Sequence, residues 1–367
     1  MKIVSPLLKH VLYPALAKAG VLRRTAAAGL AVVTYHGIIP AGYEPVDSTL
    51  DSSLVSAQTL RRQLSLLKRN YNVVSPEDVL LWCEGGRELP SRAVLLTCDD
   101  GLLNNLTDML PILQEEGLRC LFFVTGASAG DARTTLWYEE LFLVLLRAPA
   151  GPVVVSSKGL EIGGTLGTRE QRRAMWWDTV KRLSELDSES RNAFVRAAKL
   201  RYASTDATAP EELVQSDDST LERRFTLLTR SNLVQLSSAG MTVGSHTLSH
   251  PMLSRSPAEL ARAEIRESRI RLEAALGKRV WAFAYPFGDA QSVTPQVLTM
   301  ARDAGYQAAF LNIGGGLGTE LTRHAMPRIH VTAEMSLAEF EAHVAGLHAL
   351  LQRRAGRTHR GLGAALN

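Results

Sequence analysis

Residues 93–101 read Ala-Val-Leu-Leu-Thr-Cys-Asp-Asp-Gly, an apolar run that ends in two adjacent carboxylates and a glycine. A short apolar run with this ending is typical of a buried strand followed by a turn. Residues 241–250, Met-Thr-Val-Gly-Ser-His-Thr-Leu-Ser-His, place two histidines four residues apart after a second strand-like run. Each stretch therefore predicts a strand whose carboxyl end carries side chains that can bind a metal.

Strand-like and helical patterns alternate around these two stretches, which predicts a parallel α/β sheet or barrel. The first predicted strand, residues 28–36, precedes a helix in which Leu60, Leu64 and Leu67 follow helical spacing. Further predicted strands lie at residues 73–74, 120–124, 241–245, 280–285, 307–312 and 329–331. A helix from about Leu337 to Leu351 ends the predicted fold.

Several polar residues lie at the same position relative to the predicted strands. His36, Asp99, Asp100, His246 and the segment 285–288 all come at the carboxyl ends of predicted strands. In (β/α) barrels the active site lies on this face. A purely structural role would not explain why these residues share it.

The ligand types in the two stretches favour metal-assisted hydrolysis. One carboxylate and two imidazoles form a three-ligand set that leaves a position on Zn²⁺ open for water. A second carboxylate beside the metal can accept a proton from that water. The alternative is structural, with the histidines stabilising a loop and the aspartates capping the following helix, since Asp is a favoured N-cap residue.

Taken together, the two stretches resemble the motifs of the polysaccharide deacetylase family, the NodB-homology enzymes of carbohydrate esterase family 4. That family's T-F-D-D-G and H-[ST]-x-x-H motifs match residues 97–101 and 246–250. The resemblance implies a distorted, incomplete TIM-like (β/α) barrel and a metal-dependent N-deacetylase that releases acetate from N-acetylated sugars. It also implies that Asp100, His246 and His250 bind Zn²⁺, or another divalent transition metal such as Co²⁺ or Ni²⁺, and that Asp99 is the general base.

The third family motif, R-x-P-[FY], departs from the pattern here. Ala284 replaces the arginine that orients the catalytic carboxylate in the family, so the usual support of Asp99 is missing. The segment from Phe283 to Gly288 instead resembles a branch that reads F-A-Y-P-[YF]-G and carries Y-H-x-[IV] earlier, as residues 35–38 do. That branch acts on bacterial exopolysaccharides, including poly-N-acetylglucosamine. The resemblance makes four residues candidates for substrate binding: Tyr285, Pro286, Phe287 and Gly288.

A general acid must protonate the leaving amine, and histidine is the usual choice. Resemblance to the branch assigns this role to His36, which precedes the first motif. The ordinary family order assigns it to His330, although Arg328-Ile329-His330 lacks the leucine of the family's L-x-H motif. We favour His36 over His330, with His324 as a weaker third candidate.

Residues 131–225 interrupt the alternation and are predicted to form a mainly helical insertion or cap. Trp137, Tyr138 and the pair Trp176-Trp177 lie in it, and such aromatic residues either stack on sugars or fill a core. We favour the core, strongly for Trp176-Trp177 and only slightly for Trp137 and Tyr138. The predicted division of the chain is a basic amphipathic segment (1–27), barrel (28–130), insertion (131–225), barrel (226–351) and disordered basic tail (352–367).

The charge and the cysteine pattern of the chain disfavour some classes of binding partner and of cellular compartment. The net charge is only +4 and the motif region carries mixed charge, so a nucleic-acid partner is poorly supported. The three cysteines have no metal-ligand spacing, which suits a reducing compartment. Residues 1–27 are basic and too short to span a bilayer, and they are expected to form a helix that rests on an anionic membrane surface. These features predict a cytoplasmic or peripheral inner-membrane location, and an extracytoplasmic one if that segment is an export signal.

The expected substrate is therefore an N-acetylated saccharide, either of a polysaccharide or of its nascent or lipid-linked precursor. Two rival functions remain open: hydrolysis of a small non-sugar amide, and non-catalytic carbohydrate binding. A glycosidase that uses Asp99 and Asp100 is disfavoured. The two catalytic carboxyl groups of a glycosidase lie roughly 5–9.5 Å apart on either side of the scissile bond, whereas adjacent side chains after a strand tend to point to opposite faces. The sequence does not indicate an oligomeric state.

Overall fold

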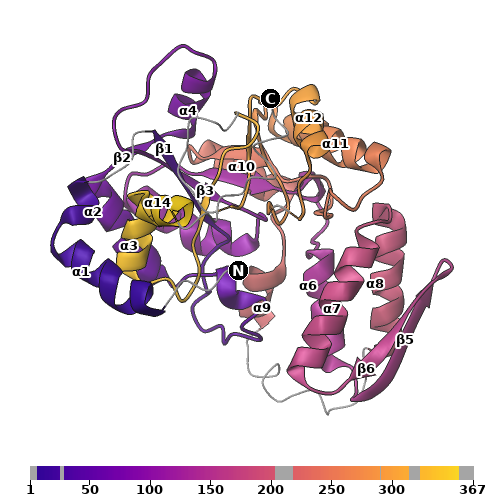
Figure 1. The fold of residues 1–367 in the computed structure, drawn as a ribbon. Helices are drawn as coiled ribbons and strands as arrows, with labels where there is room; N and C mark the ends of the chain where they lie inside the picture. Colours follow the sequence, from indigo (N-terminus) through magenta and orange to yellow (C-terminus); the bar gives the residue numbers. More distant parts are fainter. Residues whose placement is uncertain (1–5, 25–28, 203–217, 290, 314–322, 355–367) are drawn as a thin grey trace.

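The computed structural model describes residues 6–24, 29–202, 218–289, 291–313 and 323–354. Its centre is an eight-stranded sheet in which every neighbouring pair is parallel, and Figure 1 shows helices covering its outer face. The strand order is β10-β1-β3-β4-β7-β8-β9, with β2 paired to β3. The strands are β1 (Leu30–Tyr35), β2 (Asn72–Val74), β3 (Ala93–Cys98), β4 (Leu121–Val124), β7 (Thr242–Ser245), β8 (Ala282–Ala284), β9 (Ala308–Phe310) and β10 (Ile329–His330).

The sheet curls but does not close into a regular barrel. Its two end strands, β9 and β10, are linked through an isolated parallel bridge between Phe310 and Met326, just before β10 begins. The prediction of a distorted, incomplete (β/α) barrel is confirmed. The predicted strands are present, although β8 and β9 are shorter than expected.

Amphipathic helices pack on the sheet as their spacing predicts. In α3 (Ala57–Asn70), Leu60, Leu64 and Leu67 are fully buried, and the Ser56 side chain caps the first turn by accepting a hydrogen bond from the Thr59 amide. Ser75 and Asp78 form a capping box at the start of the next helix. The barrel helices are α3, α4 (Pro76–Cys83), η3 (Asn105–Met109) with α5 (Leu110–Glu115), α10 (Arg230–Ser238), α11 (Ala258–Leu276) and α12 (Pro295–Asp303).

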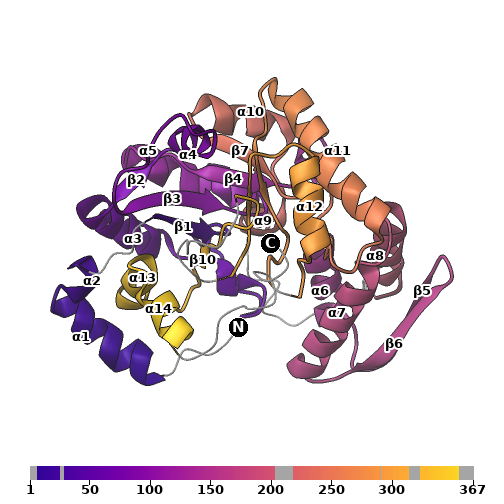
Figure 2. The ribbon, with the colours of Figure 1, turned by 45° about the horizontal axis from the view of Figure 1, so that its top comes forward.

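The insertion follows β4 and has a hydrophobic core of its own, beside the barrel in Figure 2. It contains a β-hairpin that the prediction of a mainly helical segment missed. Val153, Val155 and Ile162 point into the insertion core with the two-residue period of strands, and Lys158-Gly159 turn the chain with positive φ at both residues. The elements are α6 (Trp137–Arg147), β5 (Gly151–Ser157), β6 (Leu160–Leu166), α7 (Arg169–Leu183), α8 (Ser188–Tyr202) and α9 (Asp218–Phe225).

The two ends of the described chain pack on each other. Residues of α1 (Tyr13–Lys18) form a small cluster with α13 (Leu337–Val344), and the Tyr13 hydroxyl lies 2.8 Å from His348 Nδ1 in α14 (Leu347–Arg354). The single helix expected over 337–351 is instead two helices, because Gly346 adopts φ 77 between them. The prediction of a disordered tail from residue 352 was wrong for residues 352–354, which are helical, and residues 355–367 lie outside the described residues.

The remaining short helices are η1 (Leu8–Leu12), α2 (Val21–Arg24), η2 (Asp51–Ser53) and η4 (Gly126–Ala129). Of the predicted N-terminal segment, residues 1–5 and 25–27 lie outside the described residues. None of the helices described has both the length and the apolar character needed to cross a bilayer.

Candidate active site

The carboxyl ends of β3 and β7 bring the three predicted metal ligands together. Asp100 Oδ1 lies 3.6 Å from His246 Nε2 and 3.3 Å from His250 Nε2, and all three side chains are buried. Two ligands of a tetrahedral metal, each about 2.1 Å from it, are roughly 3.4 Å apart. The donor atoms therefore already have the separation that such an ion requires.

A backbone contact fixes the orientation of the first histidine. His246 Nδ1 lies 2.7 Å from the carbonyl oxygen of Ala284, which can only accept, so Nδ1 carries the proton and Nε2 is free to bind a metal. Burial, with a smaller contribution from His250 and against the opposing charge of Asp99, lowers the pKa of His246 to about 4. The ring is therefore neutral near pH 7, as metal binding requires.

The loops that carry the ligands have strained backbones. Among the described residues, six non-glycine residues have positive φ, and four of them belong to this site: Asp100, Thr247, His250 and Phe287. The Thr247 hydroxyl accepts a hydrogen bond from the His250 amide at 2.9 Å and stabilises that turn. Such strain is typical of functional sites, where the surrounding structure holds residues in unfavourable conformations.

Asp99 lies next to the ligands and is bound by Arg328. Two hydrogen bonds of 2.6 Å join the Arg328 guanidinium to the two oxygens of Asp99, and both side chains are buried. Burial opposes ionisation of Asp99, but the charge of Arg328 outweighs it and lowers the pKa of the carboxyl. The arginine of the third family motif is absent at Ala284, and Arg328 from another part of the chain binds Asp99 instead.

Both candidate acids lie beside this pair. His36 Nε2 is 4.0 Å from Asp99 Oδ2, and the rings of His36 and His330 are 4.7 Å apart. His330 Nε2 lies 3.2 Å from the Ser53 hydroxyl, and burial together with the neighbouring His36 lowers the pKa of His330 to about 3. His330 is thus held neutral, which makes it a poor proton donor near pH 7.

The segment 285–288 is divided between the core and the site. Tyr285 is 1% exposed and donates its hydroxyl proton to the carbonyl oxygen of His324, so its side chain is part of the core, and Pro286 is buried too. A Cβ on Gly288 would come 2.5 Å from the Asn312 amide, so glycine is needed there for packing. Only the Phe287 ring contacts a metal-ligand residue, 5.1 Å from His250 between ring centres.

The insertion also reaches the site. The indole N–H of Trp137 donates to the His250 carbonyl oxygen at 3.1 Å, and the Tyr138 ring lies 5.0 Å from the His250 ring. The preference for core packing is confirmed for Trp137 and Trp176, which are 5% and 8% exposed. It was wrong for Trp177, which is 37% exposed.

The polysaccharide deacetylase family profile matches residues 86–187 and 213–309, which make up more than half of the chain. The chain belongs to this family. The matched residues include Asp99, Asp100, His246 and His250, whereas His36 and Arg328 lie outside them.

Curated members of the deacetylase family match shorter stretches. Poly-β-1,6-N-acetyl-D-glucosamine N-deacetylase of Escherichia coli K12 is 34% identical over 89 residues, which cover 23% of this chain and 12% of that protein. The putative polysaccharide deacetylase YxkH of Bacillus subtilis is 27% identical over 104 residues, 28% of this chain and 34% of that protein. The chain thus spans about a third or less of the length of these relatives.

Solved structures of deacetylases share the fold over most of the chain. The Streptococcus pyogenes deacetylase PplD in complex with acetate superposes with a TM-score of 0.52 at 17% identity, over 86% of this chain and 96% of that one. IcaB from Ammonifex degensii gives 0.51 at 17% identity, over 87% and 98%. A de-N-acetylase from Aggregatibacter actinomycetemcomitans gives 0.52 at 14% identity, over 86% and 99%. At these identities the likeness shows the shared deacetylase fold.

Sequence reasoning named Arg328 only as a neighbour of His330 and missed its role. A signal was available, because residues two apart on a strand point to the same face, which would place the Arg328 side chain on the face of His330. A buried carboxylate stays ionised only with a cation nearby, so the absence of the family arginine also indicated that another basic residue contacts Asp99.

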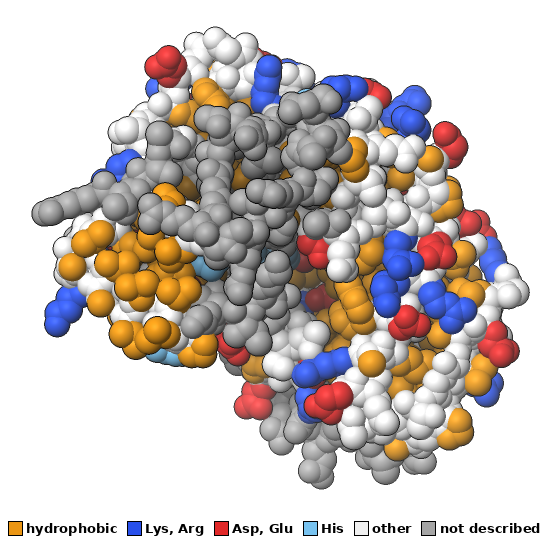
Figure 3. All heavy atoms as spheres, viewed as in Figure 1, with side chains coloured by type: hydrophobic (Ala, Val, Ile, Leu, Met, Phe, Trp, Pro, Cys, Tyr) orange, Lys and Arg blue, Asp and Glu red, His pale blue; other side chains and the backbone are white. Residues whose placement is uncertain are grey.

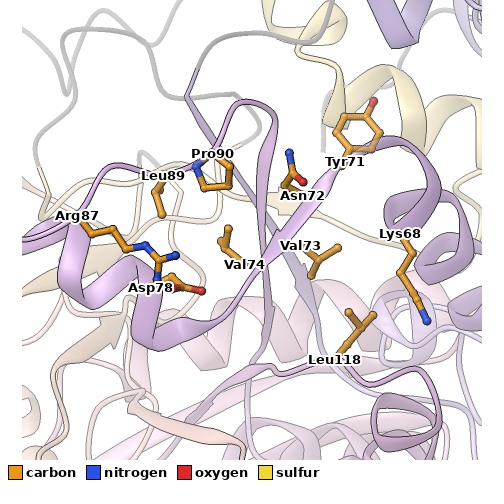
Figure 4. Close-up of a pocket in the computed structure, with 10 residues that line it drawn as sticks. All are labelled: Lys68, Tyr71, Asn72, Val73, Val74, Asp78, Arg87, Leu89, Pro90 and Leu118. Atoms are coloured by element: carbon orange, nitrogen blue, oxygen red, sulfur yellow. Dashed lines mark hydrogen bonds and ion pairs between the residues drawn. The ribbon is translucent and has the colours of Figure 1, made fainter.

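A separate cavity of about 390 Å³ lies at the opposite end of the strands (Figure 4). Its charged lining groups are paired: Asp78 with Arg87 at 2.5 Å and Lys68 with Glu116 at 2.9 Å. The described lining therefore presents no unpaired charged group. The lining residues are Lys68, Tyr71, Asn72, Val73, Val74, Asp78, Arg87, Leu89, Pro90 and Leu118.

Proposed function

We propose that the protein is a metal-dependent N-deacetylase that removes acetyl groups from N-acetylated sugars of a bacterial polysaccharide or of its lipid-linked precursor. The observation that carries the proposal is the Asp99 carboxyl group, held by two hydrogen bonds from Arg328 directly beside the buried cluster of Asp100, His246 and His250. A non-catalytic binding protein needs no such base. The similarity to a poly-β-1,6-N-acetyl-D-glucosamine N-deacetylase supports an N-acetylated sugar as the substrate.

In the proposed reaction, the acetamide C–N bond is cleaved by water to give acetate and a free amino sugar. A divalent metal held by Asp100, His246 and His250 would supply a Lewis acid that polarises the acetyl carbonyl and acidifies water. Asp99 accepts the proton of the attacking water, because its carboxyl is ionised and cannot turn away from Arg328.

His36 is the proposed acid that protonates the departing nitrogen. Its Nε2 lies 4.0 Å from Asp99 Oδ2, and its side chain is 16% exposed. His330 packs against it as a neutral neighbour. The Phe287 backbone N–H donates to none of the described residues and is the proposed donor to the oxyanion.

The test is acetate release from N-acetylglucosamine oligomers by the purified chain in Zn²⁺-loaded and chelated forms. We expect release only from the loaded protein, and a loss of 10²-fold or more in Asp99→Asn, because removal of a general base has that effect. The matched control is Asp303→Asn, an exposed aspartate at the end of α12 and outside the site. Metal content is measured for each variant, since Asp99→Asn should still hold one ion per chain.

Release that is insensitive to chelation or to Asp99→Asn would contradict the mechanism. If a protein with one metal per chain released no acetate from any oligomer, the proposed substrate class would be wrong. A screen of small amides would then test the remaining hydrolase function.

A further inference from the structure

A row of aromatic rings from the insertion and the barrel leads away from the metal ligands. We call Tyr138, Phe287 and Trp177 the aromatic wall. The Tyr138 ring lies 5.0 Å from that of His250 and 5.9 Å from that of Phe287, and the Phe287 ring lies 5.7 Å from that of Trp177. Tyr138 and Trp177 come from α6 and α7 of the insertion, and Phe287 from the loop after β8. The wall thus joins the two parts of the molecule.

Hydrogen bonds of neighbouring residues fix the position of the wall. The Trp176 indole N–H donates to the Tyr138 carbonyl oxygen at 2.7 Å, and that of Trp137 donates to the His250 carbonyl oxygen. Both tryptophans are almost fully buried in or against the insertion core. Because α6 and α7 are held in this way, Tyr138 and Trp177 have a defined position before any ligand binds, which lowers the entropic cost of binding.

The wall is more exposed than most of the other large aromatic residues of the insertion. Phe142, Phe194 and Trp176 are all below 10% exposed, whereas Trp177 is 37% exposed and Tyr138 and Phe287 are half-buried. The Tyr138 hydroxyl forms no hydrogen bond with the described residues. Exposed aromatic area next to convergent polar groups is typical of a ligand groove. In Figure 3 the surface is hollowed between the barrel and the insertion, with hydrophobic and acidic side chains along the hollow.

The chemistry of the wall fits a pyranose ring. A sugar has one face of C–H groups, which suits an aromatic ring, and an edge of hydroxyls, which suits the free tyrosine hydroxyl. Tyr138 lies against a metal-ligand residue, and Trp177 lies one ring further out. A sugar whose acetyl group reaches the ligands therefore contacts Tyr138 and Phe287, and its neighbour in the chain reaches Trp177.

We propose that the aromatic wall is a saccharide-binding subsite in which Trp177 stacks on the sugar unit next to the one being deacetylated. This inference rests on the proposed function and makes it more specific: the substrate is an oligosaccharide or polymer rather than a single N-acetyl sugar. The insertion is then part of the substrate site.

The first experiment measures kcat/KM of the Zn²⁺-loaded full chain on N-acetylglucosamine oligomers of increasing length. In Trp177→Ala we expect a loss that grows with chain length, reaching roughly five- to tenfold on the longer oligomers and appearing mainly in KM. Trp177→Phe should recover most of it. Leu200→Ala is the matched control, because Leu200 is also in the insertion, is 87% exposed and lies outside the wall. Thermal unfolding shows whether each variant is folded.

The second experiment measures oligomer binding by calorimetry in the Zn²⁺-loaded Asp99→Asn background, where no turnover is needed. Adding Trp177→Ala should weaken binding by the same five- to tenfold. Suppose that the wild type releases acetate but Trp177→Ala loses the same fraction of kcat/KM at every oligomer length, or loses none. That result would overturn the subsite and leave the deacetylase proposal intact. Binding that depends on Trp177 without acetate release from the wild type would leave the subsite intact and overturn the proposed reaction. Absence of oligomer binding would overturn the subsite.

Discussion

The candidate base Asp99 shows how a buried carboxylate is kept ionised. Asp99 is 2% exposed, and burial alone would raise the pKa of its carboxyl. Arg328 offsets this and is itself held by further hydrogen bonds, since it also donates to the Leu311 carbonyl oxygen at 3.1 Å and to the Thr34 hydroxyl at 3.2 Å. Removing one partner of such a buried pair costs on the order of 3–5 kcal/mol of stability. The pair fixes both the charge and the orientation of the base.

Replacing Arg328 with methionine should raise the pKa of Asp99, because burial then acts without the opposing cation. A base works only when ionised, so the acidic limb of the kcat/KM profile should move to higher pH, and kcat/KM at pH 7 should fall about 10²-fold or more. Arg328→Lys should recover only part of the activity, because an ammonium group cannot bind both carboxylate oxygens as the guanidinium fork does.

Arg302→Met is the control for that series, because Arg302 is a surface arginine of α12 whose side chain is 62% exposed. The pH profile is the measurement that separates the two explanations for any loss. A folded Arg328→Met protein whose acidic limb stays at the wild-type pH would show that Arg328 does not set the ionisation of Asp99.

Among the elements, α8 of the insertion supports the loop that carries His250. Arg191 of α8 is 1% exposed, hydrogen-bonds the Ser249 hydroxyl and lies 3.7 Å from the Glu264 carboxylate. Glu264 accepts the Ser249 amide proton at 2.8 Å. The guanidinium also lies over the Trp137 ring, at 5.1 Å. The residue before the second histidine is thus held from both the barrel and the insertion.

Arg191→Met should therefore weaken metal binding, because it leaves Glu264 buried without its cation and loosens the turn that aims His250 at Asp100. We expect the Zn²⁺ dissociation constant to rise about 10-fold or more, the range seen when groups that orient metal ligands are lost. Competition with a chelator of known affinity measures this directly. Arg196→Met, an exposed arginine on the same helix, is the control. Equal dissociation constants for the two variants would mean that α8 does not position the ligand loop.

The same elements show why the sequence predicts some features and not others. The strand ending at Asp99 and the helix carrying Leu60 and Leu64 have strong local patterns, and both are present. The hairpin of β5 and β6 has only four core-facing residues spread over its two strands, Val153, Val155, Ile162 and Leu166, so its pattern is weak. The pairing of Arg328 with Asp99 joins residues 229 positions apart, and no local pattern reports such a contact.

At the scale of the whole molecule, the contact between the two ends of the described chain makes the stability of the fold depend on pH. Tyr13 of α1 bonds His348 of α14, and the His348 ring stacks on that of His343 in α13 with 4.0 Å between centres. Burial, with a contribution from His348, lowers the pKa of His343 to about 3, and burial also lowers the pKa of His348. The nearby Glu339 pairs with Lys9 at 3.3 Å. His343 is therefore neutral in the folded protein at pH 5 and would be charged at that pH in the unfolded chain, where histidine has a pKa of about 6.5.

Since the unfolded chain binds more protons in this range, the free energy of unfolding should fall as the pH drops below about 6.5 and continue to fall towards the folded-state pKa. Between pH 7 and pH 5, His343 should account for about 1–2 kcal/mol of that loss. His343→Gln should lose correspondingly less stability than the wild type over the same change, as measured by urea unfolding of the metal-free protein at the two pH values. His10→Gln, at an exposed histidine of η1, should behave as the wild type. If His343→Gln and His10→Gln lose the same free energy on acidification, the packing of the chain ends does not depend on a neutral His343.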